Sequence, residues 1–225
     1  MMADLIILGA GGFGREASLL VEEINSSSPS KDKWNLLGFI DEDRAKWGLV
    51  LRGYPVLGGF ATLKDLPKEV RVISAAGNPV VKQRLVEKAF EQERQFATLV
   101  HPGIYLADDI VVGEGVIINK ETVLTTNIAL GDHVSINPGC GIGHDASIGA
   151  YSTLMWRVNI SGAAVIEESC MLGTGTVVLQ GKRVGRGTVI GAGAVVTRDL
   201  PAGSTAVGIP ARVTRKSGTS KKKES

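Results

Sequence analysis

His144 and the acidic residue beside it, Asp145, are the side chains of this sequence best suited to acid–base chemistry. An imidazole removes a proton from an amine or a hydroxyl near neutral pH. A neighbouring carboxylate raises the basicity of the imidazole and stabilises one of its tautomers. The pair therefore predicts a general base. The alternative interpretation is a histidine in a solvated loop.

A glycine-rich turn near the start of the chain indicates phosphate binding. Gly9, Gly11 and Gly14 have the spacing G-x-G-x-x-G, which gives a tight turn, exposed N–H groups and a helix N-terminus. The acidic residues 41–43 follow the next apolar run, where a ribose or a base would bind. The roughly 100 residues before the repeats are too few for a complete dinucleotide domain, which favours a mononucleotide. Alternatively, these glycines only let a strand and a helix pack closely.

Alternating strands and helices are expected to position this turn, as a small βαβ-type sheet. The serine-rich residues 26–31 are expected to end the first helix. Apolar runs and helical spacing predict strands at 5–8, 36–40, 70–75 and 96–100, and helices at 15–24 and 79–92.

His144 lies in a region, residues 110–199, that keeps an unbroken period of six. The third residue of all fifteen hexads is Ile, Leu or Val. A fixed short period is typical of a solenoid, in which each repeat buries its apolar face against its neighbours. Three hexads make one triangular coil, so residues eighteen apart lie above one another at about 4.8 Å. Gly162 is therefore expected one coil above His144.

Two further features of the hexad fit a narrow interior. Small or β-branched residues stand two places before many of the aliphatics, where a larger side chain would crowd the core. A glycine or asparagine often follows the aliphatic, and we expect these residues to turn the corners through positive φ.

Composition is that of an ordinary soluble protein. A net charge of +2 gives no reason to expect nucleic acid as a partner. Cys140 and Cys170 are expected as buried free thiols on different parts of a coil, which fits a reducing cytoplasm. Residues 214–225 are expected to form a disordered basic tail. Neither a signal peptide nor a membrane span is expected.

The hexads and the exit sequence GIPARV resemble the hexapeptide-repeat acyltransferases, whose coils form a left-handed parallel β-helix. The segments GAGGFG, GFIDED and AAGNP narrow the resemblance to the sialic acid O-acetyltransferase and bacterial nucleotide-aminosugar N-acetyltransferase group. The resemblance implies an α/β half-Rossmann-like domain at residues 1–100 that binds a nucleotide-linked sugar. It implies a β-helix at residues 101–213 that binds acetyl-CoA, and a homotrimer with sites between subunits.

The same resemblance assigns roles to individual residues. His144 is the general base, Asp145 its partner, and the Gly162 N–H stabilises the oxyanion of the tetrahedral intermediate. Gly11, Gly12 and Phe13 would meet the diphosphate, Asp41 and Glu42 the base or ribose, and Gly77 and Asn78 the nucleotide. Residues assigned to CoA are Thr153, Gly173, Thr174, Gly191 and Ala192.

The chain departs from the family pattern at several positions. Phe13 and Thr153 stand where many members have histidine, and Arg157 stands where a glycine is frequent. We expect Trp156 and Arg157 beside the acyl site, where they reshape it or contact the phosphates of CoA.

Several alternatives remain open from the sequence. The acceptor is either the amine of a 4-amino-4,6-dideoxy sugar or a hydroxyl of sialic acid or a related sugar, because both need the same base. A non-catalytic nucleotide-sugar-binding protein and a nicotinamide-dependent N-terminal domain are rivals from other classes. A zinc site shared between subunits is another alternative, because the chain has three histidines, His101, His133 and His144. Their spacing disfavours a cluster, and no metal is expected. His133 is expected to face solvent.

Overall fold

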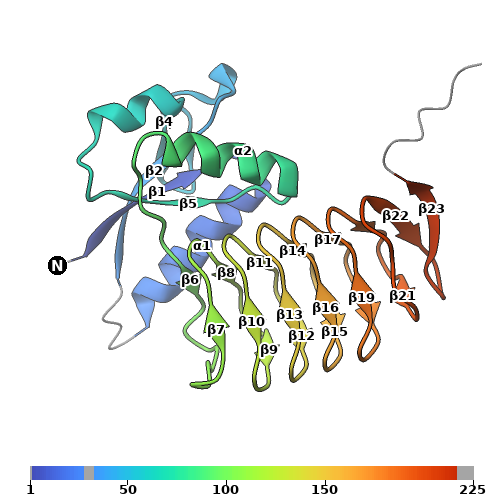
Figure 1. The fold of residues 1–225 in the computed structure, drawn as a ribbon. Helices are drawn as coiled ribbons and strands as arrows, with labels where there is room; N and C mark the ends of the chain where they lie inside the picture. Colours follow the sequence, from blue (N-terminus) through green and yellow to red (C-terminus); the bar gives the residue numbers. More distant parts are fainter. Residues whose placement is uncertain (1, 28–32, 217–225) are drawn as a thin grey trace, which may run out of the picture.

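The computed structural model describes residues 2–27 and 33–216, which form an α/β sheet domain beside a stack of coils (Figure 1). Most of the serine-rich segment after the first helix lies outside the described residues. The lysines at 221–223 also lie outside them. No helix within the described ranges is long and apolar enough to cross a membrane.

The N-terminal domain is one five-stranded sheet with the order β3-β4-β2-β1-β5, in which only the β3–β4 pair is antiparallel. Its elements follow the predicted strands and helices closely, but β3 and β4 were missed because both are short and a Gly53 turn separates them. The elements are β1 (Ala3–Leu8), α1 (Gly12–Ser26), β2 (Trp34–Ile40), η1 (Arg44–Lys46), β3 (Val50–Leu51), β4 (Tyr54–Gly58), η2 (Phe60–Asp65), β5 (Arg71–Ser74) and α2 (Pro79–Phe90).

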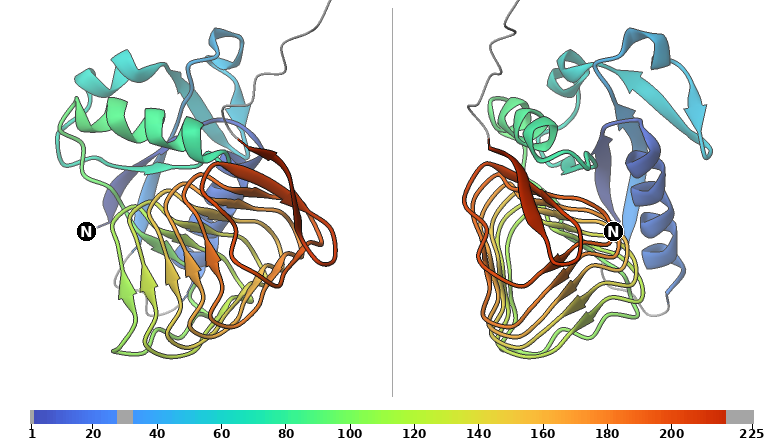
Figure 2. Two further views of the ribbon diagram at one scale, coloured as in Figure 1. Left: turned by 45° about the vertical axis from the view of Figure 1, so that its right-hand side comes forward. Right: turned by 90° about the vertical axis from the view of Figure 1, so that its right-hand side faces the viewer.

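The continuous apolar run of β1 reflects burial on both faces of the sheet. Successive side chains of a strand point to opposite faces. Leu5 and Ile7 pack in the cluster that contains α1, whereas Ile6 and Leu8 pack in the cluster that contains α2. The two helices therefore cover opposite faces, as the right-hand view of Figure 2 shows.

The coils form a β-helix with three faces of short strands, which pair in parallel except for the antiparallel pair β22–β23 at the C-terminal end. The first face holds β7 (Val111–Val112), β10 (Ala129–Leu130), β13 (Ser147–Ile148), β16 (Val165–Ile166) and β19 (Arg183–Val184). The second holds β6 (Leu99–Val100), β8 (Ile117–Ile118), β11 (Ser135–Ile136), β14 (Thr153–Leu154), β17 (Met171–Leu172), β20 (Val189–Ile190), β22 (Ser204–Val207) and β23 (Arg212–Lys216). The third holds β9 (Val123–Leu124), β12 (Gly141–Ile142), β15 (Asn159–Ile160), β18 (Val177–Val178) and β21 (Val195–Val196).

Strand pairing confirms the eighteen-residue register, since Gly141 pairs with Asn159 and Ser135 pairs with Thr153. Of the fifteen aliphatic residues, all but Val112 are buried, and Val112 lies half-buried in the first coil. The small residues expected inside are buried as well, including both cysteines. These thiols are free, and burial raises the pKa of each to about 11.

The expected role of the glycines after the aliphatics is wrong. Positive φ occurs at the last residue of the hexads, such as Asp145 and Tyr151, two places further on. The glycines are needed because the next coil approaches closely. A Cβ on Gly143 would lie 2.6 Å from the Gly162 nitrogen, and one on Gly149 would lie 2.4 Å from the Glu168 nitrogen.

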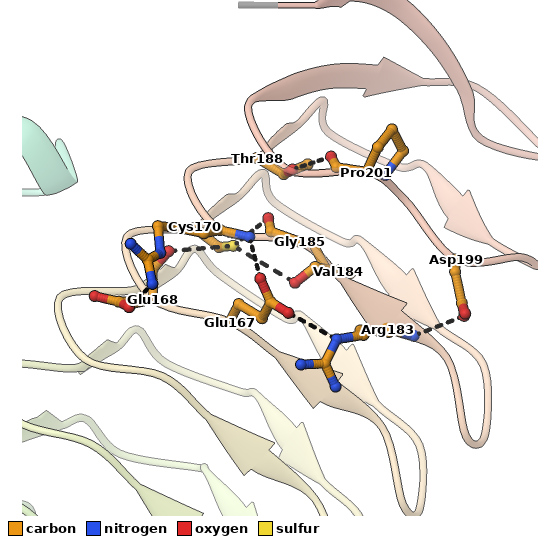
Figure 3. A network of polar contacts seen from close by, with 10 residues as sticks. Glu167, Glu168, Cys170, Arg183, Val184, Gly185, Thr188, Asp199 and Pro201 are labelled. Carbon is orange, nitrogen blue, oxygen red and sulfur yellow. Dashed lines mark hydrogen bonds and ion pairs between the residues drawn. The ribbon is translucent and has the colours of Figure 1, made fainter.

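Exposed polar contacts also join neighbouring coils near the C-terminal end (Figure 3). Glu167 accepts a hydrogen bond from the Arg183 side chain at 2.7 Å, and Asp199 accepts one from the Arg183 backbone at 2.9 Å. Exposed pairs of this kind contribute little stability. The aliphatic interior and the backbone ladder therefore hold the coils together.

Both junctions of the β-helix differ from the sequence predictions. Phe96 bridges to β5, but Leu99–Val100 (β6) pairs with β8, so the predicted strand at 96–100 joins the two parts of the molecule. At the other end, β23 includes residues 214–216, which were expected to belong to the disordered tail. These residues pair with β22, and this pairing satisfies backbone groups at the end of the stack.

Candidate active site

His144 and Asp145 lie on the edge of the β-helix between the third and first faces, in the corner that joins β12 to β13. The His144 Nδ1 and the Asp145 Oδ2 are 2.7 Å apart, and about half of the His144 side chain is exposed. Hydrogen bonds from His144 and then from Asn127 lower the pKa of the Asp145 carboxyl. The two side chains thus form a pair on an accessible surface.

The charged state of Asp145 selects the tautomer of His144. An ionised carboxylate only accepts hydrogen bonds, so the proton must lie on the Nδ1 of His144. The opposite ring nitrogen, Nε2, then carries a lone pair and is able to accept a proton. This is the arrangement that a general base requires.

Gly162 lies one coil above His144, as the register predicted. A Cβ at this position would be 2.5 Å from the Nε2 of His144, so a larger residue would force the imidazole to move. The Gly162 carbonyl accepts a hydrogen bond from Gly181 at 3.0 Å. The Gly162 backbone therefore lies close to the free ring nitrogen.

Asn127 is a residue of this site that the sequence reasoning missed. Its Nδ2 donates to the Asp145 Oδ1 at 2.6 Å, and the two residues are eighteen apart. Asn127 thus holds the Asp145 carboxylate in position, and this carboxylate in turn orients the imidazole of His144. The register used to find Gly162 above His144 also identifies Asn127 below Asp145.

A cleft of about 320 Å³ opens where the strands of the N-terminal sheet end. Such a position is typical of ligand sites in parallel α/β sheets. Three cationic side chains, Lys46, Arg84 and Lys88, line it together with the carboxylates of Asp41 and Glu42, so its lining has one more positive than negative charge, which suits an anionic ligand. The other lining residues are Gly9, Ile40, Ala76, Val81 and Leu85.

Asp41 and Glu42 line this cleft, as expected, but their oxygens already have partners within the protein. Asp41 accepts from the Ala10 N–H at 2.8 Å and from Lys46 at 3.0 Å. Burial raises the pKa of Asp41, but its hydrogen bonds outweigh this effect and the net shift is downward. The hydrogen bond from Lys88 is the main cause of the lowered pKa of Glu42. Both carboxylates therefore hold the cationic lysines in place.

The remaining predicted nucleotide residues are not among those that line the cleft. Gly11 and Gly12 are exposed at the start of α1, where a Cβ would meet nothing within 4 Å. Phe13 packs against the α1 cluster. Gly77 is half-buried, and the Asn78 side-chain oxygen caps α2 by accepting from Val80 and Val81.

The residues assigned to CoA do not lie beside His144 in the chain. Gly173, Thr174, Gly191 and Ala192 lie on the edge between the second and third faces, exposed or half-buried. Trp156 and Arg157 lie on this same edge, with the residues assigned to CoA and away from His144 of the same chain. The reason is that twelve residues, or two hexads, lead to a different corner of the coil.

Thr153 is withdrawn as a CoA residue, because it is completely buried beneath α2. Its hydroxyl accepts a hydrogen bond from the Nζ of Lys82 at 2.9 Å.

The expected exposure of His133 is also wrong. Only 2% of this residue is accessible, and its ring packs against Phe90, Phe96 and Tyr151. Burial lowers the pKa of His133. His101 lies at the domain junction, 3.8 Å from Glu23. Across residues 2–27 and 33–216, no three His, Cys, Asp or Glu side chains form a group that could hold a metal ion.

Comparisons with known proteins identify similar chains. A family model described as the PglD N-terminal domain matches residues 4–89. GDP-perosamine N-acetyltransferase of Escherichia coli O157:H7 is 33% identical over 221 residues, which cover 95% of this chain and 97% of that protein. WeeI of Acinetobacter baumannii AYE is 31% identical with a TM-score of 0.81, covering 95% of this chain and 100% of its own.

A structure of PerB from Caulobacter crescentus in complex with CoA and GDP-perosamine is also similar. It is 26% identical with a TM-score of 0.83, and the match covers 96% of this chain and 99% of PerB. These matches confirm the expected fold, a half-Rossmann-like α/β domain followed by a left-handed parallel β-helix.

The fold and the His–Asp pair on a β-helix edge define a hexapeptide-repeat acyltransferase. The full-length match then places the protein within this class: the chain belongs to the family of sugar acetyltransferases that use acetyl-CoA as acetyl donor.

Proposed function

We propose that this protein transfers an acetyl group from acetyl-CoA to the amine of a nucleotide-linked 4-amino-4,6-dideoxy sugar. The observation that carries the proposal is the His144–Asp145 pair, which meets Gly162 on a β-helix edge. The full-length relative named as a GDP-perosamine N-acetyltransferase supports an amine acceptor. The cationic cleft of the N-terminal domain supports a substrate that carries a diphosphate.

In the proposed mechanism, the Nε2 of His144 accepts a proton from the sugar amine as its nitrogen attacks the acetyl carbonyl carbon. The C–N bond forms, and the carbonyl oxygen becomes an oxyanion that the Gly162 N–H stabilises. The intermediate collapses when the C–S bond breaks, and the protonated His144 returns its proton to the departing CoA thiolate. Asp145 keeps the imidazole in the required tautomer and stabilises the imidazolium.

We propose a homotrimer with one active site at each subunit interface. The support is the separation of the assigned residues, because His144 and the exposed CoA residues Thr174 and Ala192 lie on different edges of one β-helix. A three-fold cyclic assembly places the third–first edge of one subunit against the second–third edge of the next. Buried free thiols are compatible with the reducing cytoplasm as the site of action.

The first test is CoA thiol release from acetyl-CoA with GDP-, UDP- and dTDP-linked 4-amino sugars and with free sialic acid. We expect turnover of one amino sugar, and loss of this turnover in His144→Ala. Turnover with sialic acid alone would assign the enzyme to O-acetylation. Binding of CoA and nucleotide without thiol release from any acceptor would favour a non-catalytic binding protein.

A further inference from the structure

Lys82 is the one lysine of the described residues that is completely buried, and the proposed chemistry does not use it. It projects from α2, the helix that covers one face of the N-terminal sheet, onto the second face of the β-helix. Its Nζ donates to the Ser135 hydroxyl at 2.9 Å and to the Thr153 hydroxyl at 2.9 Å. It also lies 3.0 Å from the His133 carbonyl and 3.3 Å from the Ser152 carbonyl.

All four acceptors are neutral, so no carboxylate compensates the burial of this amine. Burying a cation without a counterion is costly, and it is tolerated only where its protons are fully hydrogen-bonded. Burial lowers the pKa of Lys82 to about 7. An apolar residue at this position would avoid the cost, which implies that the hydrogen bonds of Lys82 serve a purpose besides stability.

The surface of the β-helix under α2 is repetitive, and this repetition suggests what the hydrogen bonds of Lys82 do. Coils that repeat at about 4.8 Å present nearly the same shape at each step, so apolar packing alone fixes the position of a helix along them poorly. Five successive coils of the second face have the outward residues Ile117, Ser135, Thr153, Met171 and Val189. Of these five, only Ser135 and Thr153 carry hydroxyls, and Lys82 binds both. A shift of α2 by one coil would replace one of the two hydroxyls by the apolar side chain of Ile117 or Met171.

The same helix forms one wall of the nucleotide cleft. Lys82, Val86 and Ala89 lie on the buried face of α2, spaced by three and four residues. A different face of α2 lines the cleft with Val81, Arg84, Leu85 and Lys88. The position of α2 on the β-helix therefore sets the position of two cationic side chains in the cleft.

We propose that Lys82 is a positioning residue for the nucleotide-linked substrate: by bonding two adjacent coils, it fixes α2, and with it Arg84 and Lys88, at one register along the β-helix. This inference rests on the proposed function only in that the cleft binds the nucleotide.

The test compares Lys82→Met, which keeps the length of the side chain and removes the amine, with Lys64→Met, the same change at an exposed position of η2. Binding of GDP, UDP and dTDP is measured by calorimetry, and KM and kcat are measured with the amino sugar that the wild type acetylates. We expect Lys82→Met to weaken nucleotide binding and raise the sugar KM about tenfold, as the loss of a few buried hydrogen bonds would. The KM for acetyl-CoA is expected to stay unchanged, as are all values in Lys64→Met.

A lower melting temperature with unchanged nucleotide affinity and sugar KM would assign Lys82 a merely structural role and overturn the inference. If Lys82→Met does not fold, Thr153→Val and Ser135→Ala each remove one acceptor, and each is expected to weaken nucleotide binding in the same direction. Unchanged affinity in both would overturn the inference as well. Failure of the proposed function is distinguishable, because the wild type would then bind a nucleotide without acetylating any sugar. A wild type that binds none of the three nucleotides would overturn both.

Discussion

Two dipeptides with the same residues in opposite order occupy two edges of the β-helix. Asp132–His133 lies on the edge between the first and second faces, beneath the N-terminal domain, and its imidazole is buried with no partner for Nδ1 within the described residues. His144–Asp145 lies on the third–first edge, where no element of the described residues covers it, and its imidazole is exposed and paired with a carboxylate.

The difference shows that the domain packed against a corner of the β-helix changes the environment of the histidine in that corner. In a covered corner the histidine is removed from water, so its charged form is unfavourable and its ring only packs against neighbouring side chains. An open corner leaves its histidine hydrated and free to meet a substrate. Substitutions at the two corners should therefore have opposite consequences.

The largest expected effect is the loss of turnover in His144→Ala. Removing a positioned general base lowers kcat by roughly 10²- to 10⁴-fold. Steady-state thiol release measures the effect, and circular dichroism verifies that the fold is intact. A variant that keeps more than a tenth of the wild-type kcat would contradict the role of His144.

His133→Ala should show the reverse pattern. The ring fills a buried space among Phe90, Phe96 and Tyr151, so its removal is expected to lower the free energy of unfolding by about 2–4 kcal/mol. The kcat of the folded enzyme should stay within about twofold, a change of less than 0.5 kcal/mol in the barrier. Urea unfolding and active-site-normalised kinetics distinguish the two quantities. A large loss of kcat without loss of stability would break the comparison between the corners.

Asp145→Asn tests whether the open corner depends on its carboxylate. An amide that presents its NH₂ group to Nδ1 favours the tautomer in which Nε2 carries the proton. We expect kcat/KM to fall roughly 10- to 100-fold, which is part of the full contribution of a general base. A pH–rate profile measures the change, with Asp132→Asn as the matched control at the covered corner. Equal effects of the two substitutions would be inconsistent with the assigned role.

Burial of Lys82 between the N-terminal domain and the β-helix should make the free energy of unfolding depend on pH. Burial lowers the pKa of Lys82 from an ordinary value of 10.5 to about 7, so the unfolded chain binds more protons than the folded one between these values. Stability from this group therefore increases as the pH rises above 7, by at most about 1.4 kcal/mol per pH unit. Urea unfolding at pH 7, 8 and 9 and fixed protein concentration should show this slope in the wild type. Identical slopes in Lys82→Met would contradict it.

The smallest expected effect belongs to Asn127→Ala. Loss of one hydrogen bond to the Asp145 carboxylate should reduce kcat/KM for the sugar about 2- to 10-fold. The KM for acetyl-CoA should change less than this. Asn127→Asp is the informative companion, because it replaces the donor with a second negative charge. If Asn127→Ala is as active as the wild type, the hydrogen bond from Asn127 to the Asp145 carboxylate does not contribute to activity.

Much of this arrangement was predictable because a solenoid converts sequence spacing into spatial position. The period of six predicted the coils, and the eighteen-residue register placed Gly162 over His144. The same register places Asn127 below Asp145. The paired strands β3 and β4 escaped prediction because strands of two and five residues around a turn carry little periodic signal.

The β-helix, the glycine turn and the His144–Asp145 pair follow from the sequence alone, since each depends on contacts between residues at a fixed and short spacing. Which corners of the β-helix are covered depends on how the N-terminal domain packs against it. Lys82 and Thr153 are seventy-one residues apart, and no local pattern indicates that an amine on a helix will bond a hydroxyl on a coil. Burial of His133 and the loss of Thr153 as a CoA residue both follow from packing between distant segments, which the repeat pattern does not encode.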